Sequence, residues 1–127
     1  MPICLISGAK SVVVAAEVVT LAWTHSVEKT EWRETYAATP AGLQIVEARI
    51  KGSGAGMEPG EGARLVDGWW VWRPALPALA SVPLARSGAV ADWRVCSHHA
   101  CTAAGDLVPG AAPDAGMVLA PCAGGRP

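Results

Sequence analysis

A histidine and nearby glutamates at the end of a predicted strand form the group of side chains best suited to chemistry in this sequence. With the two-residue period of a strand, Leu21, Trp23 and His25 share one face. Glu28 and Glu34 follow just beyond it. A histidine beside a carboxylate can transfer protons or anchor a polar ligand, and it can also be a structural hydrogen-bonded pair. The sequence leaves all three interpretations open.

A glycine-rich segment, residues 51–62, supplies the second group of candidate ligand-binding residues. Gly54 and Gly56 can present backbone N–H groups to a carboxylate or another small anion. Glu58 is the acidic residue of this loop that is best placed to be held in position. The loop lacks the Gly-Lys-Ser/Thr ending and the following helix of a phosphate-binding loop, so we do not expect a nucleotide site.

Two cysteines and two histidines lie within one six-residue stretch, and they suggest either a disulfide or a metal site. The stretch contains Cys96, His98, His99 and Cys101. Zinc takes four tetrahedral ligands, usually from two separate segments, and four ligands this close in sequence would strain the backbone. We therefore expect a disulfide or dithiol between Cys96 and Cys101 that closes a hairpin, with both histidines exposed at its tip. A metal site built from all four residues is the weaker alternative.

The sequence has six tryptophans and no phenylalanine, so tryptophan must dominate the apolar packing. We expect most of them in the core. The alternative is an apolar pocket or docking face in which indole N–H groups orient a ligand. In the segment 69–72, alternation places Trp70 and Trp72 on one face and Trp69 on the other. Trp23 and Trp70 are the tryptophans that we assign to the candidate ligand site.

Short strand patterns separated by turn residues predict an all-β fold. We expect strands at residues 3–7, 11–16, 19–27, 31–37, 43–50, 64–66, 69–72 and 89–96. Asp67–Gly68 is typical of a two-residue hairpin turn. Within residues 43–50, simple alternation places Glu47 and Arg49 on the same side as Leu43 and Ile45.

These patterns favour a single antiparallel β-sandwich or small barrel with short hairpins, formed by residues 1–103. Prolines between residues 74 and 83 indicate an extended crossing at the surface. Residues 104–127 are rich in Ala, Gly and Pro, and we expect a disordered tail in which only residues 117–119 could dock.

Length and charge exclude several functional classes. The chain has 127 residues, which is one domain, and a net charge of −1 without a basic cluster, which argues against nucleic-acid binding. The apolar runs near the N-terminus are too short for a membrane span and do not resemble a signal peptide. We therefore expect a cytoplasmic protein, with a periplasmic or membrane-associated protein as the alternative. Cys4 and Cys122 lie near opposite ends, and nothing in the sequence pairs them.

Four segments in this order resemble the bacterial domain-of-unknown-function family 1850: LAWTHSVEKTEW, EARIKGSGAGME, DGWWVW and DWRVC. The resemblance extends from about Cys4 to Cys101. Members of that family are commonly encoded beside the fused permease and the solute-binding protein of TAXI-type TRAP transporters, so the resemblance implies an accessory role in solute uptake. No enzymatic activity is established for the family. The residues that it marks in this sequence are His25, Ser26, Glu28, Gly54, Gly56, Met57 and Glu58.

We therefore expect a non-catalytic protein that binds a small anionic solute or a transporter subunit through His25, Glu28 and Glu58. Its partner would be the permease or the solute-binding protein, and it would contact the membrane only through that partner. No cofactor is expected. The first alternative is a small hydrolase or isomerase with His25 as base, although strand alternation turns Ser26 away from His25 and argues against a nucleophile pair. The second alternative is a purely structural scaffold that docks on the permease.

Overall fold

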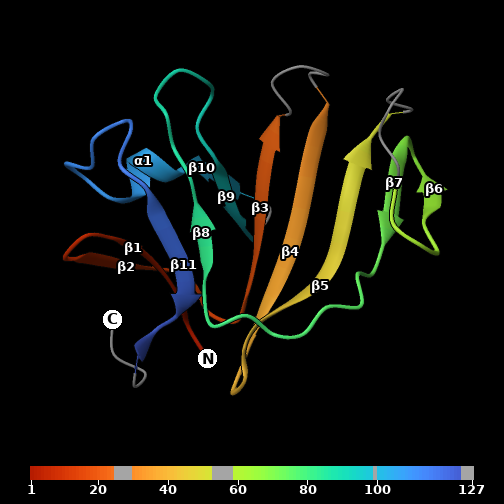
Figure 1. Ribbon diagram of the computed structural model, residues 1–127, viewed down its shortest axis with the longest axis horizontal. Coiled ribbons are helices and arrows are strands. Elements are labelled where there is room, and N and C mark those ends of the chain that lie inside the picture. Colours follow the sequence, from red (N-terminus) through yellow and green to blue (C-terminus); the bar gives the residue numbers. More distant parts are fainter. Residues whose placement is uncertain (25–29, 53–58, 99, 124–127) are drawn as a thin grey trace.

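The computed structural model describes residues 1–24, 30–52, 59–98 and 100–123, and these form two antiparallel sheets that pack as a sandwich (Figure 1). Each sheet is open at both edges, so the architecture is the sandwich rather than the barrel. The smaller sheet has the order β2 (Lys10–Ala15), β1 (Ile3–Ser7), β11 (Met117–Pro121) and β8 (Val82–Leu84).

The larger sheet has seven strands and carries the features that matter for function. Its order is β10 (Ala100–Ala103), β9 (Arg94–Ser97), β3 (Val18–Thr24), β4 (Glu31–Thr39), β5 (Gly42–Lys51), β7 (Trp69–Trp72) and β6 (Arg64–Val66). In Figure 1 the strands from β9 to β6 follow one another across the view, and β7 and β6 lie at the end away from the smaller sheet. One face of this sheet, here called the inner face, packs on the smaller sheet, and the other is called the outer face.

Apolar residues from both sheets form one core on the inner face. Leu5 and Leu119 of the smaller sheet and Leu21 and Leu43 of the larger sheet are each fully buried in it. Leu21 and Val19 alternate with polar Thr20 along β3, as the two-residue period predicts. The sheets therefore bury one face each, which is how a sandwich of this size excludes water.

A β-bulge in the pair β4–β5 corrects the expected alternation of β5. Thr35 pairs with Glu47 whereas the next residue, Tyr36, pairs with Ile45, so one residue of β5 is inserted in the register. An inserted residue reverses the side on which later residues point. Leu43 and Ile45 therefore face the core, while Glu47 and Arg49 lie on the outer face, contrary to the simple alternation.

The predicted two-residue hairpin turn at Asp67–Gly68 is confirmed, and it joins β6 (Arg64–Val66) to β7 (Trp69–Trp72). Asp67 has φ 50° and Gly68 has φ 85°, which are the two positive values that a type I′ turn requires. The proline-containing crossing is also extended, and Leu79 within it pairs with Leu43 at the start of β5 through two backbone hydrogen bonds of 2.7 and 2.8 Å. Pro83 lies in β8, which is an edge strand, where a missing N–H group is tolerated.

The segment after residue 103 differs from the expected disordered tail. It contains the short helix α1 (Ala104–Leu107) and β11, which lies between β1 and β8 in the smaller sheet. Val108 and Leu119 are fully buried. The few large apolar residues of this segment are thus placed at core positions, and a composition average hides that placement.

An ion pair fastens the same segment to the loop after β8. The Arg86 guanidinium binds Asp92 through two contacts of 2.9 and 3.0 Å and also donates to the carbonyls of Ala112 and Ala115. Burial would raise the pKa of Asp92, but hydrogen bonds from Arg86 and from the N–H groups of Gly105 and Trp93 outweigh burial and lower that pKa. These contacts use four of the five N–H groups of Arg86, and together they hold the segment after residue 103 against the loop.

Two disulfides close the chain at different ranges. Cys4 pairs with Cys122 across 118 residues, a pairing that the sequence did not indicate, because β1 and β11 become neighbours only in the folded sheet. Cys96 pairs with Cys101 across the β9–β10 hairpin, where the two cysteines are direct cross-strand partners.

Candidate functional site

Most of the residues proposed for ligand binding belong to two segments outside the described part of the chain. His25, Glu28, Gly54, Gly56 and Glu58, with Ser26, Met57 and His99, lie outside the described residues. The strands beside these segments are described. β3 ends at Thr24 and β5 ends at Lys51. Because β3, β4 and β5 alternate in direction, these two strand ends lie at the same end of the larger sheet. Glu34, which could have partnered His25, accepts a hydrogen bond of 2.8 Å from the hydroxyl of Tyr36.

Trp23 and Trp70, the two candidate tryptophans, lie on the inner face in one row across the sheet. The row contains, in order, Trp23, Trp32, Ile50, Trp70 and Leu65. Two strands separate Trp23 from Trp70, so with a strand spacing of about 4.8 Å they are roughly 14 Å apart. Trp23 and Trp70 thus lie on the same surface, but no cavity among the described residues is lined by both of them.

The indole of Trp23 packs between two others. Its ring centroid lies 6.1 Å from that of Trp32 and 4.9 Å from that of Trp93. The Trp93 indole N–H donates to the carbonyl of Ala85. The Trp32 indole N–H is buried without a hydrogen-bond partner in the part of the chain that the structure describes. Trp23 and Trp93 pack against the core as partly buried side chains, but all six tryptophans are only partly buried and none belongs to the buried core. The expectation that most tryptophans lie in the core is therefore wrong.

The hairpin of β9 and β10 has disulfide chemistry rather than metal chemistry. Since the sulfur atoms of Cys96 and Cys101 are bonded to each other, neither can act as a thiolate ligand, which removes the four-residue metal site. The described residues contain no cluster of three or more His, Cys, Asp or Glu side chains that could hold a metal ion. His98 is exposed at the hairpin tip with φ 52°, a left-handed conformation that a two-residue turn requires.

The outer face of the larger sheet carries a row of arginines that the sequence analysis did not identify. The cross-strand pairs join Arg94 to Ala22, Ala22 to Arg33, Arg33 to Arg49, Arg49 to Val71 and Val71 to Arg64. We call Arg94, Arg33, Arg49 and Arg64 the arginine row. Lys51 adds a fifth cation to this face, and Glu31 and Glu47 are the carboxylates that β4 and β5 place on it. The outer face is therefore cationic in a chain whose net charge is −1.

Arg33 and Arg49 are direct cross-strand partners, although like charges in that position repel each other. Each is anchored by a glutamate two residues earlier on its own strand. Arg33 Nε lies 2.6 Å from Glu31, and Arg49 Nε lies 2.5 Å from Glu47. Glu31 also lies 3.4 Å from Arg94. Among the described residues, the terminal guanidinium nitrogens of Arg33 and Arg49 have no hydrogen-bond partner, so they can receive an anion.

The ring of Trp69 holds two of these cations in place. The Arg33 guanidinium carbon lies 5.3 Å and the Lys51 ammonium 4.9 Å from the ring centroid. Both distances are within the range of cation–π attraction. Trp69 is thus the one tryptophan of β7 on the outer face, as alternation predicted, and it lines a groove there.

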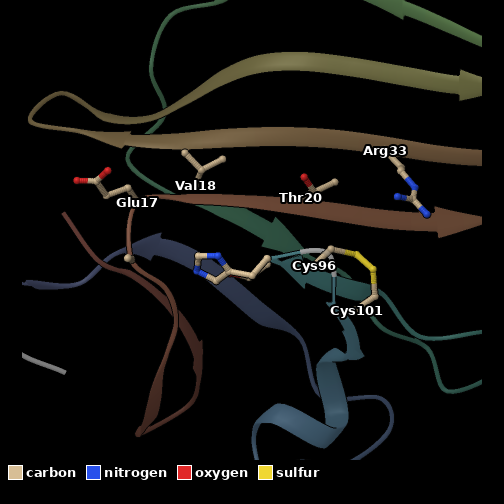
Figure 2. A pocket seen from close by; sticks show the side chains of 9 residues that line it. Glu17, Val18, Thr20, Arg33, Cys96 and Cys101 are labelled. Atoms are coloured by element: carbon tan, nitrogen blue, oxygen red, sulfur yellow. A yellow bond between two sulfur atoms is a disulfide. The ribbon is translucent and has the colours of Figure 1, made fainter. Parts of the chain in front are cut away.

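Two adjoining hollows lie on the outer face. The arginine cleft has a volume of about 390 Å³ and is lined by Thr20, Arg33, Thr35, Glu47, Arg49 and Trp69. The hairpin cavity, shown in Figure 2, has about 540 Å³ and is lined by Ala16, Glu17, Val18, Thr20, Arg33, Cys96, Ser97, His98 and Cys101. Thr20 and Arg33 line both hollows. A ligand can therefore reach from one into the other across these two side chains.

Alternation within single strands was the available signal for this site. In the segment 31–36, Glu31, Arg33 and Thr35 alternate with Trp32, Glu34 and Tyr36. That pattern indicates one polar face, but it does not show that Arg33 will lie opposite Arg49. Only the register of β4 and β5, including the bulge, brings the arginines together.

The match to known families covers the residues of this site. The family described as "Domain of unknown function (DUF1850)" matches residues 19–103, more than half of the chain and every residue of the arginine cleft. No curated protein and no solved structure matches the chain. None of the described helices is long and apolar enough to cross a membrane.

Proposed function

This chain belongs to the DUF1850 family, and we propose that it is a non-catalytic accessory protein of a TAXI-type TRAP transporter that binds a small anionic solute. The transporter association rests on the resemblance described above. The observation that carries the binding proposal is the direct opposition of Arg33 and Arg49 in the arginine cleft.

Charge repulsion explains why that opposition favours an anion. Two guanidinium groups on directly opposite strand positions destabilise a sheet, and their anchoring glutamates offset only part of this cost. A bound anion would offset the remainder through charge-assisted hydrogen bonds to the terminal nitrogens. An arrangement that is costly when empty and favourable when filled is the pattern of a binding site.

Five candidate residues outside the described part of the chain remain in this proposal. They would contribute ligand contacts from the end of the larger sheet at which β3 and β5 end. These residues are His25, Glu28, Gly54, Gly56 and Glu58. Substitution His25→Ala should reduce transporter-dependent uptake while leaving the fold unchanged. If uptake and folding are both unchanged, His25 is not part of the site.

We further propose that the protein works in an oxidising compartment, the alternative to the cytoplasm that the sequence left open. Both pairs of cysteines form disulfides, and disulfides persist outside the reducing cytoplasm. Mass measurement of the protein isolated without reductant tests this point. A mass four hydrogens below that of the reduced chain supports it, and free thiols contradict it.

Binding of a transporter subunit is the second candidate function. The inner-face row ends at Leu65, which is 59% exposed beside the half-buried Trp70. An exposed leucine next to a tryptophan is suited to a protein contact. Co-purification of the permease with the wild-type protein, and its loss on Leu65→Asp, would support this candidate.

A thermal unfolding assay with small anions tests the main proposal. A ligand at 100 times its dissociation constant stabilises a protein by about 2.7 kcal/mol, which gives a measurable shift. The shift should disappear in the double variant Arg33→Gln/Arg49→Gln and persist in Arg73→Gln, an exposed arginine that lines neither hollow. Equal shifts in all three proteins, or uptake fully restored by the double variant, would show that the cleft is not the site.

A further inference from the structure

We infer that the ligand is a monocarboxylate with an uncharged body, whose carboxylate lies in the arginine cleft and whose body lies in the hairpin cavity. This inference rests on the proposed function and names the chemical class of its ligand. It follows from the distribution of charge along the two hollows.

The arginine cleft has one uncompensated positive charge. Its lining includes Arg33, Arg49 and the Glu47 carboxylate, and the groups in direct contact with that lining add the Glu31 carboxylate on Arg33 and the Lys51 ammonium over Trp69. A carboxylate carries one negative charge at neutral pH and matches this balance. A phosphate group carries about 1.5 to 2 negative charges. Its negative charge would exceed the positive charge of the cleft, and the excess would be repelled by the Glu47 carboxylate. The cleft therefore favours a carboxylate over a phosphate.

A hydroxyl pair at the junction supplies a further donor. The hydroxyl oxygens of Thr20 and Thr35 lie 2.8 Å apart, so one hydroxyl donates to the other. The accepting hydroxyl keeps its own O–H, which can donate to a carboxylate held by the arginines. Since Thr20 also lines the hairpin cavity, this donor lies where the ligand would pass from one hollow to the other.

The hairpin cavity has its charges at opposite ends. In Figure 2, Arg33 and Glu17 lie far apart, with Val18 and Thr20 between them and the Cys96–Cys101 disulfide facing this stretch. Arg33 is the only Lys or Arg among the residues that line the cavity. A second carboxylate at the far end of a ligand would meet the Glu17 carboxylate, and besides Arg33 the His98 imidazole is the one lining side chain with a nitrogen donor to set against this repulsion. The cavity therefore accepts an uncharged body and disfavours a dicarboxylate.

Calorimetric titration with four probes at constant ionic strength and pH 7.5 tests this inference: acetate, hexanoate, hexanedioate and inorganic phosphate. Hexanoate should bind at least about tenfold more tightly than acetate, because each buried methylene contributes up to about fourfold. Hexanedioate and phosphate should each bind at least about fivefold more weakly than hexanoate, because of the Glu17 and Glu47 carboxylates. Equal or tighter binding of hexanedioate or phosphate would overturn the inference.

A variant that fills the hairpin cavity provides the second test. Val18 is 49% exposed, so Val18→Trp should fold while its indole occupies the space of the ligand body. Hexanoate should then bind no more tightly than acetate, while the affinity for acetate stays within about twofold of wild type. An unchanged preference for hexanoate would show that its body lies elsewhere.

The outcomes separate this inference from the proposed function. If phosphate or hexanedioate is preferred and binding is lost in Arg33→Gln/Arg49→Gln, the monocarboxylate inference is wrong but anion binding in the cleft stands. If none of the four probes binds the wild-type protein, both are wrong.

Discussion

The two faces of the seven-stranded sheet use the same strands for opposite purposes. The inner face is apolar and packs on the smaller sheet, whereas the outer face carries the arginine row, Lys51 and the carboxylates of Glu17, Glu31 and Glu47. Leu21 is fully buried on the inner face, while its neighbour Thr20 points into both outer hollows. Substitutions at adjacent residues of one strand should therefore have separate effects: one at Leu21 should change the stability of the fold, and one at Thr20 should change the candidate site.

The largest expected effect belongs to the inner face. Leu21→Ala should lower the free energy of unfolding by about 3 kcal/mol, since it removes a fully buried side chain and leaves a cavity. Thr20→Ala, on the outer face, should cost about 1 kcal/mol through loss of its hydrogen bond to Thr35. Urea denaturation of both variants measures the contrast. Equal losses would show that the two faces do not divide stability in this way.

The outer-face disulfide should have the next largest effect. Replacing Cys96 and Cys101 together by serine reopens a loop with a sequence separation of only 5 residues. The loop-entropy relation gives about 2 kcal/mol for this length, and urea denaturation without reductant measures it. A loss above about 4 kcal/mol would mean that the hairpin supports the core as well as the outer face.

A smaller, pH-dependent effect is expected at Tyr36 on the inner face. Burial raises the pKa of Tyr36 above its usual value, and the hydrogen bond and negative charge of Glu34 raise it further. The folded state therefore favours the neutral phenol. This contribution is complete below the unfolded pKa of about 10 and is lost as the pH rises above it.

The substitution Tyr36→Phe isolates that contribution. This substitution should lower the free energy of unfolding by about 1 kcal/mol at pH 8. Between pH 9 and pH 11, the free energy of unfolding of the variant should fall less than that of the wild-type protein. Tyr36 is the only tyrosine of the sequence, so absorbance of the phenolate reports its titration directly. A folded protein whose tyrosine titrates near pH 10 would contradict the prediction.

The smallest effect on stability should come from the arginine cleft itself. The side chains of Arg33 and Arg49 are 35% and 39% exposed, and exposed ion pairs contribute about 0–1 kcal/mol each. Arg33→Gln/Arg49→Gln should thus stay within about 1 kcal/mol of wild type in urea denaturation, because relief of arginine repulsion offsets the lost pairs. A decrease of several kcal/mol in the free energy of unfolding would show that the two arginines stabilise the fold. The two faces would then not differ in their contribution to stability.

Local patterns predicted most of the strands. Alternation and turn residues identified the strands from β1 to β7 and the hairpin at Asp67–Gly68, because these features depend on neighbours in the sequence. The predicted strand at 89–96 begins later, at Arg94. The expected alternation of Glu47 and Arg49 was wrong because a bulge depends on the partner strand.

Features that require distant segments could not be predicted. β11 is short and lies in an Ala, Gly and Pro-rich segment, and it becomes a strand through pairing with β1 and β8. The arginine row likewise combines residues from four strands. Of the candidate residues that are described, Trp23 and Trp70 do share a surface, but it is the inner face rather than the cationic one.

The Cys4–Cys122 disulfide makes most of the chain a covalent ring. One cut by a protease within that ring, for example beside the exposed Leu76 of the crossing segment, would not release a fragment. The nicked protein would migrate as one species until a reductant separates its two pieces. The same closure brings the two ends of the fold together, so a circular permutant that joins them and opens at the crossing segment should keep both faces of the larger sheet intact.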